Sequence, residues 1–188
     1  MTEKLKHFLK SQADFDEQQL DKIVAHFRPK SIKRNNILLK EGEVCKEFYF
    51  IHTGCIRIYF VDREGFEKTR SVLLDGDIGT ALTSFISQKP SIEFIDALEN
   101  TELLTISHKD FYQLNNEMAP WKEFYQKFME MAYLNQSRKI EALMTLNAKQ
   151  RFQKLLKGNP VLIQRLSNKV LASFLDMREE TLSRIKSK

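Results

Sequence analysis

The sequence LASFLDMREETLSRI, residues 171–185, holds two apolar helical patterns separated by the short break Leu175–Asp176–Met177. Two short helices joined by a tight turn form a helix-turn-helix, in which the second helix presents its N-terminal residues to bases in the major groove. An isolated amphipathic helix gives similar spacing, so the rest of the chain has to decide between the two. The residues expected to bury the two helices are Val170, Leu171, Phe174 and Leu175, followed by Met177, Leu182 and Ile185.

The side chains left on the exposed side have the chemistry of DNA contact. Arginine can fork onto guanine, an acid can accept from cytosine N4, and serine or threonine can contact a base or a phosphate. Two acids in the first turn of the second helix also oppose the positive end of its dipole favourably. The predicted DNA-binding residues are Ser167, Asn168, Lys169, Arg178, Glu179, Glu180, Thr181, Ser183, Arg184 and Lys186.

The charge of the chain is concentrated at the same end. Residues 147–188 carry ten Lys and Arg against three acids, a net charge of +7, whereas residues 1–146 carry −2. Such asymmetry points to a polyanionic partner for the C-terminal part. Solvated basic faces are common, so charge alone does not establish DNA binding. Phosphate attraction is expected from Lys169, Lys186, Lys188 and the basic helix ahead of the motif.

The segment from residue 31 to about 107 has the pattern of short strands. Residues 56–61 alternate with a period of two, and EGE at 41–43, DREG at 62–65 and LDGD at 74–77 are turn signals. Residues 94–106 predict two strands joined by a turn at Glu99–Asn100. Short strands with frequent turns favour a small barrel or β-roll over a βαβ fold.

Helices are expected on both sides of this strand region. Residues 1–28 have helical spacing, with Asp14 or Asp16 as the cap of a second helix that ends by Pro29. A long helix of about 25 residues opens at Pro120 and is apolar on two faces, more than one core needs. A symmetric dimer accounts for the second face, and burial within one subunit is the alternative.

Capping signals divide the C-terminal part. Asn147 and Gln150 form a capping box for a helix that ends at Gly158, the sequence NP at 159–160 marks a turn, and Ser167 caps the next helix. We therefore predict an α+β chain: residues 1–119 form the β-roll with N-terminal helices, residues 120–146 the long helix, and residues 147–188 the helix-turn-helix domain.

The order of β-roll, long helix and helix-turn-helix resembles the cyclic-AMP receptor protein/Fnr (Crp/Fnr) superfamily of bacterial transcription regulators. The motif LASFLDMREETLSRI and the β-roll glycines Gly42, Gly54, Gly76 and Gly79 carry the resemblance, and RFQKLLKGNPVLIQRL, residues 151–166, is similar to a short-tailed branch of it. The resemblance implies a cyclic-nucleotide-binding-like β-roll (a double-stranded β-helix or jelly roll), a dimerisation helix, double-stranded DNA as ligand and RNA polymerase as a partner.

The resemblance also assigns roles within the motif. Glu180 matches a base-reading acid, Thr181 a phosphate contact, and Arg184 a base or phosphate contact. Glu179 stands where the family has arginine, so that guanine contact is not carried over. Asp176 replaces the usual turn glycine and is tolerable because Asp adopts left-handed conformations more readily than most residues. Because only four residues follow Arg184 in this sequence, we expect no winged hairpin of the kind that many members have.

The effector pocket is where the family pattern fails. Cyclic-nucleotide-binding members have a Gly-Glu-Leu turn and, about ten residues later, Arg followed by Ser or Thr. The corresponding residues here are Gly79, Thr80, Ala81, Ser91 and Ile92, with neither the glutamate nor the arginine. A buried phosphate without a cation is costly, and Lys89 is the only nearby candidate. We expect that cyclic AMP is not the effector, and that the pocket binds another small molecule or none.

The sequence lacks the residue sets that a disulfide framework, a metal site or an enzyme active site would require. Cys45 and Cys55 are too few for a disulfide framework or an iron–sulfur cluster, and they are expected to be buried free thiols, with a redox pair as the alternative. His52 is expected to be a strand residue rather than a metal ligand, and no H-x-H pair supports a cupin metal site. A haem sensor that uses His52 or a cysteine stays an alternative that no sequence feature favours. Neither an enzyme motif, a membrane span nor a secretory signal is found, so a cytoplasmic non-enzyme is expected.

Two hypotheses of different class remain. The first is a homodimeric DNA-binding transcription regulator whose β-roll senses a ligand other than cyclic AMP or has become structural. The second is a sensory or scaffolding β-roll dimer whose helical tail binds protein rather than DNA. Salt-dependent DNA binding distinguishes them.

Overall fold

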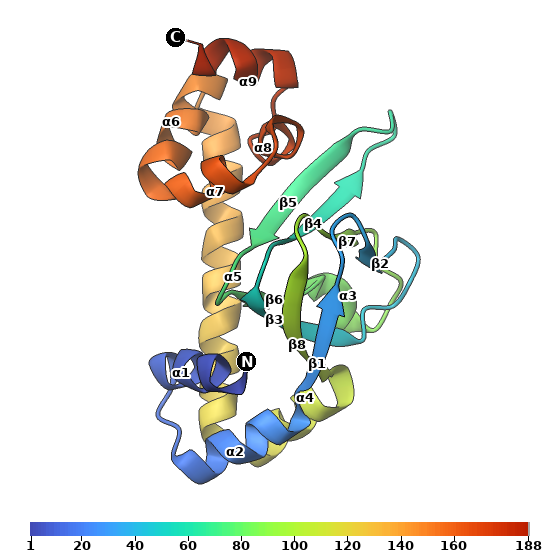
Figure 1. The fold of residues 1–188 in the computed structure, drawn as a ribbon, viewed down its shortest axis with the longest axis vertical. Helices are drawn as coiled ribbons and strands as arrows, with labels where there is room; N and C mark the ends of the chain where they lie inside the picture. The colour runs from blue at the N-terminus through green and yellow to red at the C-terminus, as the bar shows by residue number, and fades with distance from the viewer. Residues whose placement is uncertain (188) are drawn as a thin grey trace. The chain divides into compact units, whose positions relative to one another are not determined.

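A computed structural model describes residues 1–187 (Figure 1), so Lys188 lies outside the described residues. The described chain forms two compact units. The β-roll unit comprises residues 1–58 and 72–130, and the helical unit comprises residues 59–71 together with the chain from Met131 onward. The predicted boundaries at 119 and 146 fall at the two ends of the long helix, whereas this division groups a β-hairpin with the C-terminal helices.

The strands of the described chain form two antiparallel sheets, as the sequence predicted for a β-roll. One sheet has the order β1-β8-β3-β6, and the other β2-β7-β4-β5. The first contains β1 (Arg28–Ile32), β8 (Thr101–Ser107), β3 (Glu47–Thr53) and β6 (Ile78–Gly79), and the second contains β2 (Ile37–Leu39), β7 (Phe94–Ala97), β4 (Ile56–Val61) and β5 (Glu67–Leu73). The predicted turn at Glu99–Asn100 therefore joins strands of different sheets.

One of the β-roll glycines is required by a close approach. Gly54 has φ +110°, and a Cβ built on it would lie 2.4 Å from Oγ1 of Thr101. That hydroxyl accepts from the amide of Cys55 at 3.0 Å, which ties the β3–β4 turn to the start of β8. Any side chain at residue 54 would have to break this contact.

Helices cover the β-roll and complete its core. They are α1 (Thr2–Gln12), α2 (Glu17–His26), α3 (Leu82–Ser87), α4 (His108–Glu117) and the first part of α5 (Ala119–Thr145). Asp16 caps α2 with a capping box, as one of the two predicted caps. Leu5 and Leu9 of α1 and Trp121 and Phe124 of α5 are buried in one cluster with the apolar residues of the strands.

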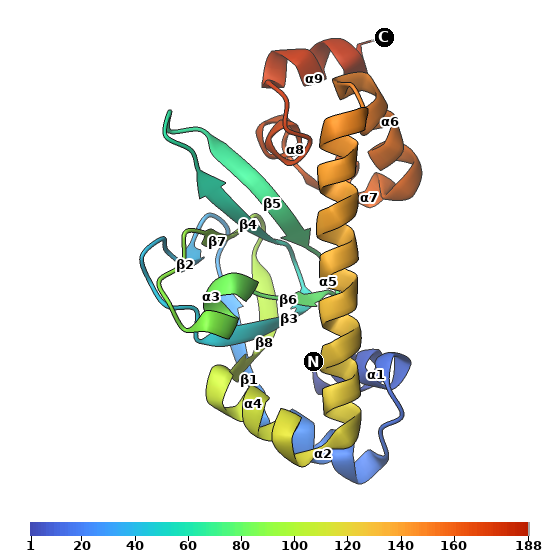
Figure 2. The ribbon, with the colours of Figure 1, turned by 180° about the vertical axis from the view of Figure 1, so that it is seen from behind.

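The helical unit contains the rest of α5, the β4–β5 hairpin and the C-terminal helices (Figure 2). These helices are α6 (Ala148–Gly158), α7 (Pro160–Arg165), α8 (Asn168–Phe174) and α9 (Glu179–Lys186). The predicted capping box of Asn147 with Gln150 and the Ser167 cap are confirmed. The prediction missed α7: the Asn159–Pro160 turn is itself the start of a helix, with Asn159 as cap and Pro160 in the first turn.

No helix within residues 1–187 is both long and apolar enough to pass through a bilayer.

Candidate nucleic-acid interface

The turn between α8 and α9 is a Schellman motif, in which a left-handed residue ends a helix and two amides bind its last carbonyls. The amide of Met177 donates to the carbonyl of Ala172 at 3.0 Å, and the amide of Asp176 donates to that of Ser173 at 3.2 Å. Asp176 has φ +50°, the left-handed conformation that glycine adopts most easily. The aspartate in place of the family's glycine is therefore tolerated, as expected, and the chain reverses within a few residues.

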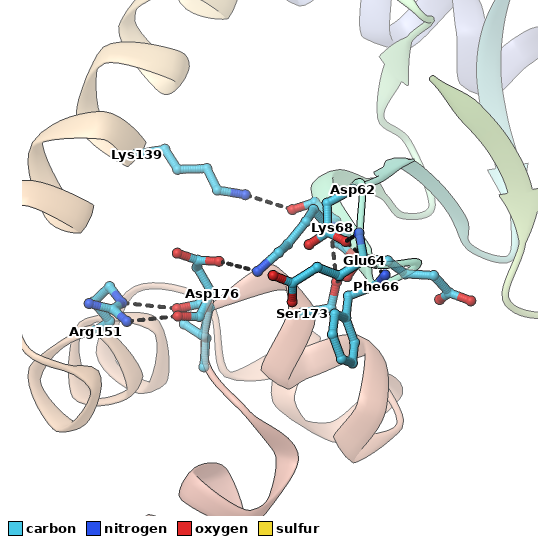
Figure 3. A network of polar contacts seen from close by, with 11 residues as sticks. Asp62, Glu64, Phe66, Lys68, Lys139, Arg151, Ser173 and Asp176 are labelled. Carbon is cyan, nitrogen blue, oxygen red and sulfur yellow. Dashed lines mark hydrogen bonds and ion pairs between the residues drawn. The ribbon is translucent and has the colours of Figure 1, made fainter. Parts of the chain in front are cut away.

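Two cations hold this turn in place (Figure 3). Arg151 of α6 donates from Nε to the carbonyl of Leu175 at 2.9 Å and from Nη2 to that of Asp176 at 3.0 Å. Its Nη1 donates to the carbonyl of Leu146, which follows α5, at 2.7 Å. Lys68 of the hairpin pairs with the Asp176 carboxylate at 3.1 Å. Although α6 was expected to supply phosphate attraction, Arg151 is occupied with backbone carbonyls.

The recognition helix α9 is anchored on one side and exposed on the other. Leu182 is fully buried and Ile185 partly so. Arg178 is the N-cap, and Glu179 and Glu180 form the first turn, so all three lie at the end of the helix that faces bases in a helix-turn-helix. Of the predicted α9 residues, Arg178, Glu179, Glu180, Ser183, Arg184 and Lys186 are exposed, and Thr181 is half-buried.

The remaining predicted DNA contacts lie at the start of α8 and are exposed. Ser167 uses its hydroxyl to accept from the amide of Val170, as a helix cap does. Lys186 donates to Oδ1 of Asn168 at 2.7 Å, which ties α9 to α8. Lys169 pairs with Glu67 of the hairpin at 3.1 Å. Two predicted phosphate-attracting lysines thus have partners within the chain.

The hairpin itself was not assigned to this site from the sequence. Within the helical unit, Ser173 of α8 donates to the carbonyl of Glu67 at 2.8 Å and accepts from the amide of Thr69 at 2.8 Å. Strand β5 is the edge of its sheet, so these backbone groups would otherwise lack strand partners. Nothing in the local pattern of either segment signals this contact, because the bonded residues are more than 100 positions apart.

Lys139 of α5 completes the attachment of the edge strand (Figure 3). Its ammonium donates to the carbonyls of Thr69 at 2.7 Å and Arg70 at 3.1 Å and lies 4.7 Å from the ring centroid of Phe174. Burial, with a smaller contribution from the nearby Arg70 charge, lowers the pKa of Lys139 to about 8. A lysine this desolvated acts as a structural donor rather than as a surface charge.

The predicted effector residues lie around α3 in the β-roll unit, and their polar groups are engaged locally. Thr80 is buried and donates to the carbonyl of Glu47 at 2.7 Å, with the Cys45 thiol 3.0 Å away. Burial raises the pKa of the Cys45 thiol. Gly79 and Ala81 are also buried. The residue in the position of the family's ribose-binding glutamate thus hydrogen-bonds to its own domain.

The second half of the predicted pocket is arranged in the same way. Ser91 is buried, donates to the carbonyl of Glu93 at 3.0 Å and accepts from its amide at 2.9 Å. Glu93, two residues after Ser91, is itself 5% exposed, so an acid is buried close in sequence to the position of the family's arginine. Ile92 is 70% exposed and does not join the other four residues, and Lys89 is exposed.

The described residues hold two free cysteines and no cluster of metal ligands. Cys45 and Cys55 are both buried free thiols, which is the preferred of the two interpretations given above. Among residues 1–187 no three His, Cys, Asp or Glu side chains converge as a metal site would require.

Comparison with known proteins agrees with this architecture. Residues 29–117 match the cyclic nucleotide-binding domain family. An anaerobic regulatory protein of Pasteurella multocida is 29% identical over 133 residues, which cover 71% of this chain and 47% of that protein. The fumarate and nitrate reduction regulatory protein of Yersinia pestis is 30% identical over 134 residues, covering 71% and 52%. The chain thus spans about half the length of the curated relatives it matches.

Solved structures share the fold at low sequence identity. FixK2 from Bradyrhizobium japonicum superposes with a TM-score of 0.75 at 15% identity, covering 86% of this chain and 83% of that one. The c-di-GMP-responsive global regulator CLP of Xanthomonas campestris gives 0.72 at 17% identity, covering 90% and 89%.

The fold and these matches define a protein that joins a cyclic-nucleotide-binding-type β-roll, through a long helix, to a C-terminal helix-turn-helix. Residues 29–117 belong to the cyclic nucleotide-binding domain family, and the curated relatives are anaerobic and fumarate and nitrate reduction regulatory proteins. The structural neighbours include a transcriptional regulator of the Crp/Fnr family.

Proposed function

We propose that the protein is a homodimeric, cytoplasmic transcription regulator that binds double-stranded DNA through α8 and α9 and acts with RNA polymerase rather than as an enzyme. The observation that carries the proposal is the Schellman turn, which directs the exposed N-terminal end of α9 outward while Leu182 anchors the helix. The regulatory function of the relatives supports it, as does the +7 charge of residues 147–188.

The exposed apolar residues of α5 support the dimer. Tyr133, Ile140 and Met144 are 73%, 48% and 81% exposed, and their spacing of seven and four residues places them on one stripe. Apolar side chains so placed are typical of a helix that packs against a second copy. Ile140→Glu should shift the sedimentation coefficient from that of a dimer to that of a monomer.

Cyclic AMP is not proposed as the effector. Thr80 and Ser91, which replace the glutamate and arginine of the family, hydrogen-bond within the β-roll unit, and Glu93 adds a buried acid nearby. We expect no heat of cyclic-AMP binding by calorimetry at micromolar concentrations. Micromolar binding that is lost on Thr80→Ala would refute this part of the proposal.

DNA binding is tested by selecting fragments of genomic DNA on the purified protein and titrating the best fragment at several salt concentrations. Arg184→Ala should weaken specific binding by about 1–3 kcal/mol if the guanidinium contacts a base. Lys109→Ala is the matched control, because it removes a charge of the same sign from an exposed position of α4 in the β-roll unit. A protein that retains no fragment at low salt would contradict DNA binding and favour a helical tail that binds protein.

A further inference from the structure

A groove of about 790 Å³ lies between the β4–β5 hairpin on one side and one face of α8, the α8–α9 turn and the start of α9 on the other, all within the helical unit. The charged residues that line it comprise six acids and three cations. The hairpin contributes three of the acids, Asp62, Glu64 and Glu67. Negative charge is therefore concentrated beside the residues that we expect to contact a polyanion.

Glu67 is the hairpin acid with a defined target. Its carboxylate lies 3.1 Å from Nζ of Lys169, whose side chain remains 67% exposed. Lys68, the next residue, pairs with Asp176 at 3.1 Å. Two of the three cations in the groove are therefore neutralised by acids of the same unit.

The backbone of the hairpin holds Glu67 at this position. Lys169 and Ser173 are four residues apart on α8 and so lie on the same face of the helix. Ser173 binds the carbonyl of Glu67 at 2.8 Å and the amide of Thr69 at 2.8 Å, while Lys169 binds the Glu67 carboxylate. Glu67 of the edge strand therefore binds both Ser173, through its carbonyl, and Lys169, through its carboxylate.

The tip of the hairpin is also well defined. Oδ1 of Asp62 accepts from the amides of Glu64 and Phe66 at 3.0 and 2.9 Å, and Gly65 takes a φ of +85° (Figure 3). A tip closed by these bonds presents its acids in a fixed arrangement. One side of the groove is therefore formed by the three acids of a hairpin whose tip is held by hydrogen bonds.

We propose that Glu67 is an autoinhibitory latch, which occupies Lys169 and holds an acidic hairpin against the start of the recognition helix. This proposal rests on the proposed DNA binding. In the latched state Lys169 is unavailable to a phosphate, and the three hairpin acids repel the DNA backbone. DNA must exchange the Glu67–Lys169 pair for a phosphate–Lys169 contact. Strands β4 and β5 continue from the hairpin into the β-roll unit, so a change in the β-roll can reach the latch through the strands themselves.

The test compares wild-type protein with Glu67→Gln by fluorescence anisotropy on one DNA fragment at several salt concentrations. Glu67→Gln should bind about two- to fivefold more tightly, the range expected for an exposed ion pair. The plot of log affinity against log salt should steepen by about 0.9, because one more lysine contacts a phosphate. Glu102→Gln is the control, since it makes the same charge change at an exposed position of β8 in the other unit.

The pairing is tested by repeating the comparison in a Lys169→Gln background. If Glu67 acts through Lys169, the gain from Glu67→Gln should be clearly smaller there than in the wild-type background, and what remains is the relief of direct repulsion between the Glu67 carboxylate and the DNA backbone. Equal affinity of wild type and Glu67→Gln, or an equal gain with and without Lys169, would overturn the latch. DNA binding by Glu67→Gln under conditions in which the wild type does not bind would support the latch. If neither wild type nor any variant binds DNA, the proposed function fails and the latch with it.

Discussion

Replacing Arg151 by methionine tests whether this residue organises the recognition turn or contacts phosphate. Its guanidinium donates to the carbonyls of Leu146, Leu175 and Asp176 at 2.7–3.0 Å. A hydrogen bond that involves a charged group contributes about 1.5–3 kcal/mol, and water can replace part of it at a half-buried site. We therefore expect Arg151→Met to lower the free energy of unfolding by about 2–4 kcal/mol.

Urea unfolding followed by circular dichroism measures this loss, with Lys154→Met as the control. Lys154 lies on the same helix and is exposed, so its replacement should change stability by less than about 0.5 kcal/mol. The salt dependence of DNA affinity should keep its slope in Arg151→Met, because the three carbonyls and not phosphates bind the guanidinium. Unchanged stability together with a slope shallower by about one phosphate contact would refute the structural role.

Two further predictions concern stability. The pKa of Lys139 is about 8 in the folded protein, against 10.5 for a lysine exposed to solvent, so the unfolded chain binds more protons between these values. Wild-type stability, measured relative to Lys139→Met, should accordingly rise between pH 8 and pH 10.5, by at most about 3 kcal/mol; a flat difference in urea titrations would contradict the buried ammonium. Gly54→Ala should lower thermal stability by about 2 kcal/mol or more, because its Cβ would meet Thr101 at 2.4 Å, whereas Gly65→Ala, with an open surrounding, should cost about 1 kcal/mol.

The elements of this fold follow from local signals, and most of them were predictable for that reason. The capping box of Asn147 with Gln150, the Ser167 cap and the left-handed Asp176 each involve residues within four positions of one another. The alternation of residues 56–61 and the turn residues predicted the hairpin in the same way. Helix α7 was missed because Asn159–Pro160 is equally consistent with a turn and with a helix start.

In the effector region the sequence predicted which residues differ from the family but not which atoms those residues bind. Substitutions at Thr80 and Ser91 predicted a changed pocket from residue identity alone, but only the structure shows both hydroxyls bonded to nearby backbone and Ile92 turned outward. The identity of a side chain limits which ligands it can bind, whereas its partners depend on atoms brought close by packing.

By itself, the sequence determined the order of β-roll, long helix and helix-turn-helix and the basic C-terminal end, because period, capping and charge are properties of neighbouring residues. The tertiary structure alone decided that strands β7 and β8 separate into different sheets, that Arg151 binds carbonyls, and that Glu67 meets Lys169 across 102 positions. The outward-facing backbone groups of an edge strand and the long side chain of an arginine produce no periodic pattern in the sequence. The groups that they bind are therefore known only from the folded structure.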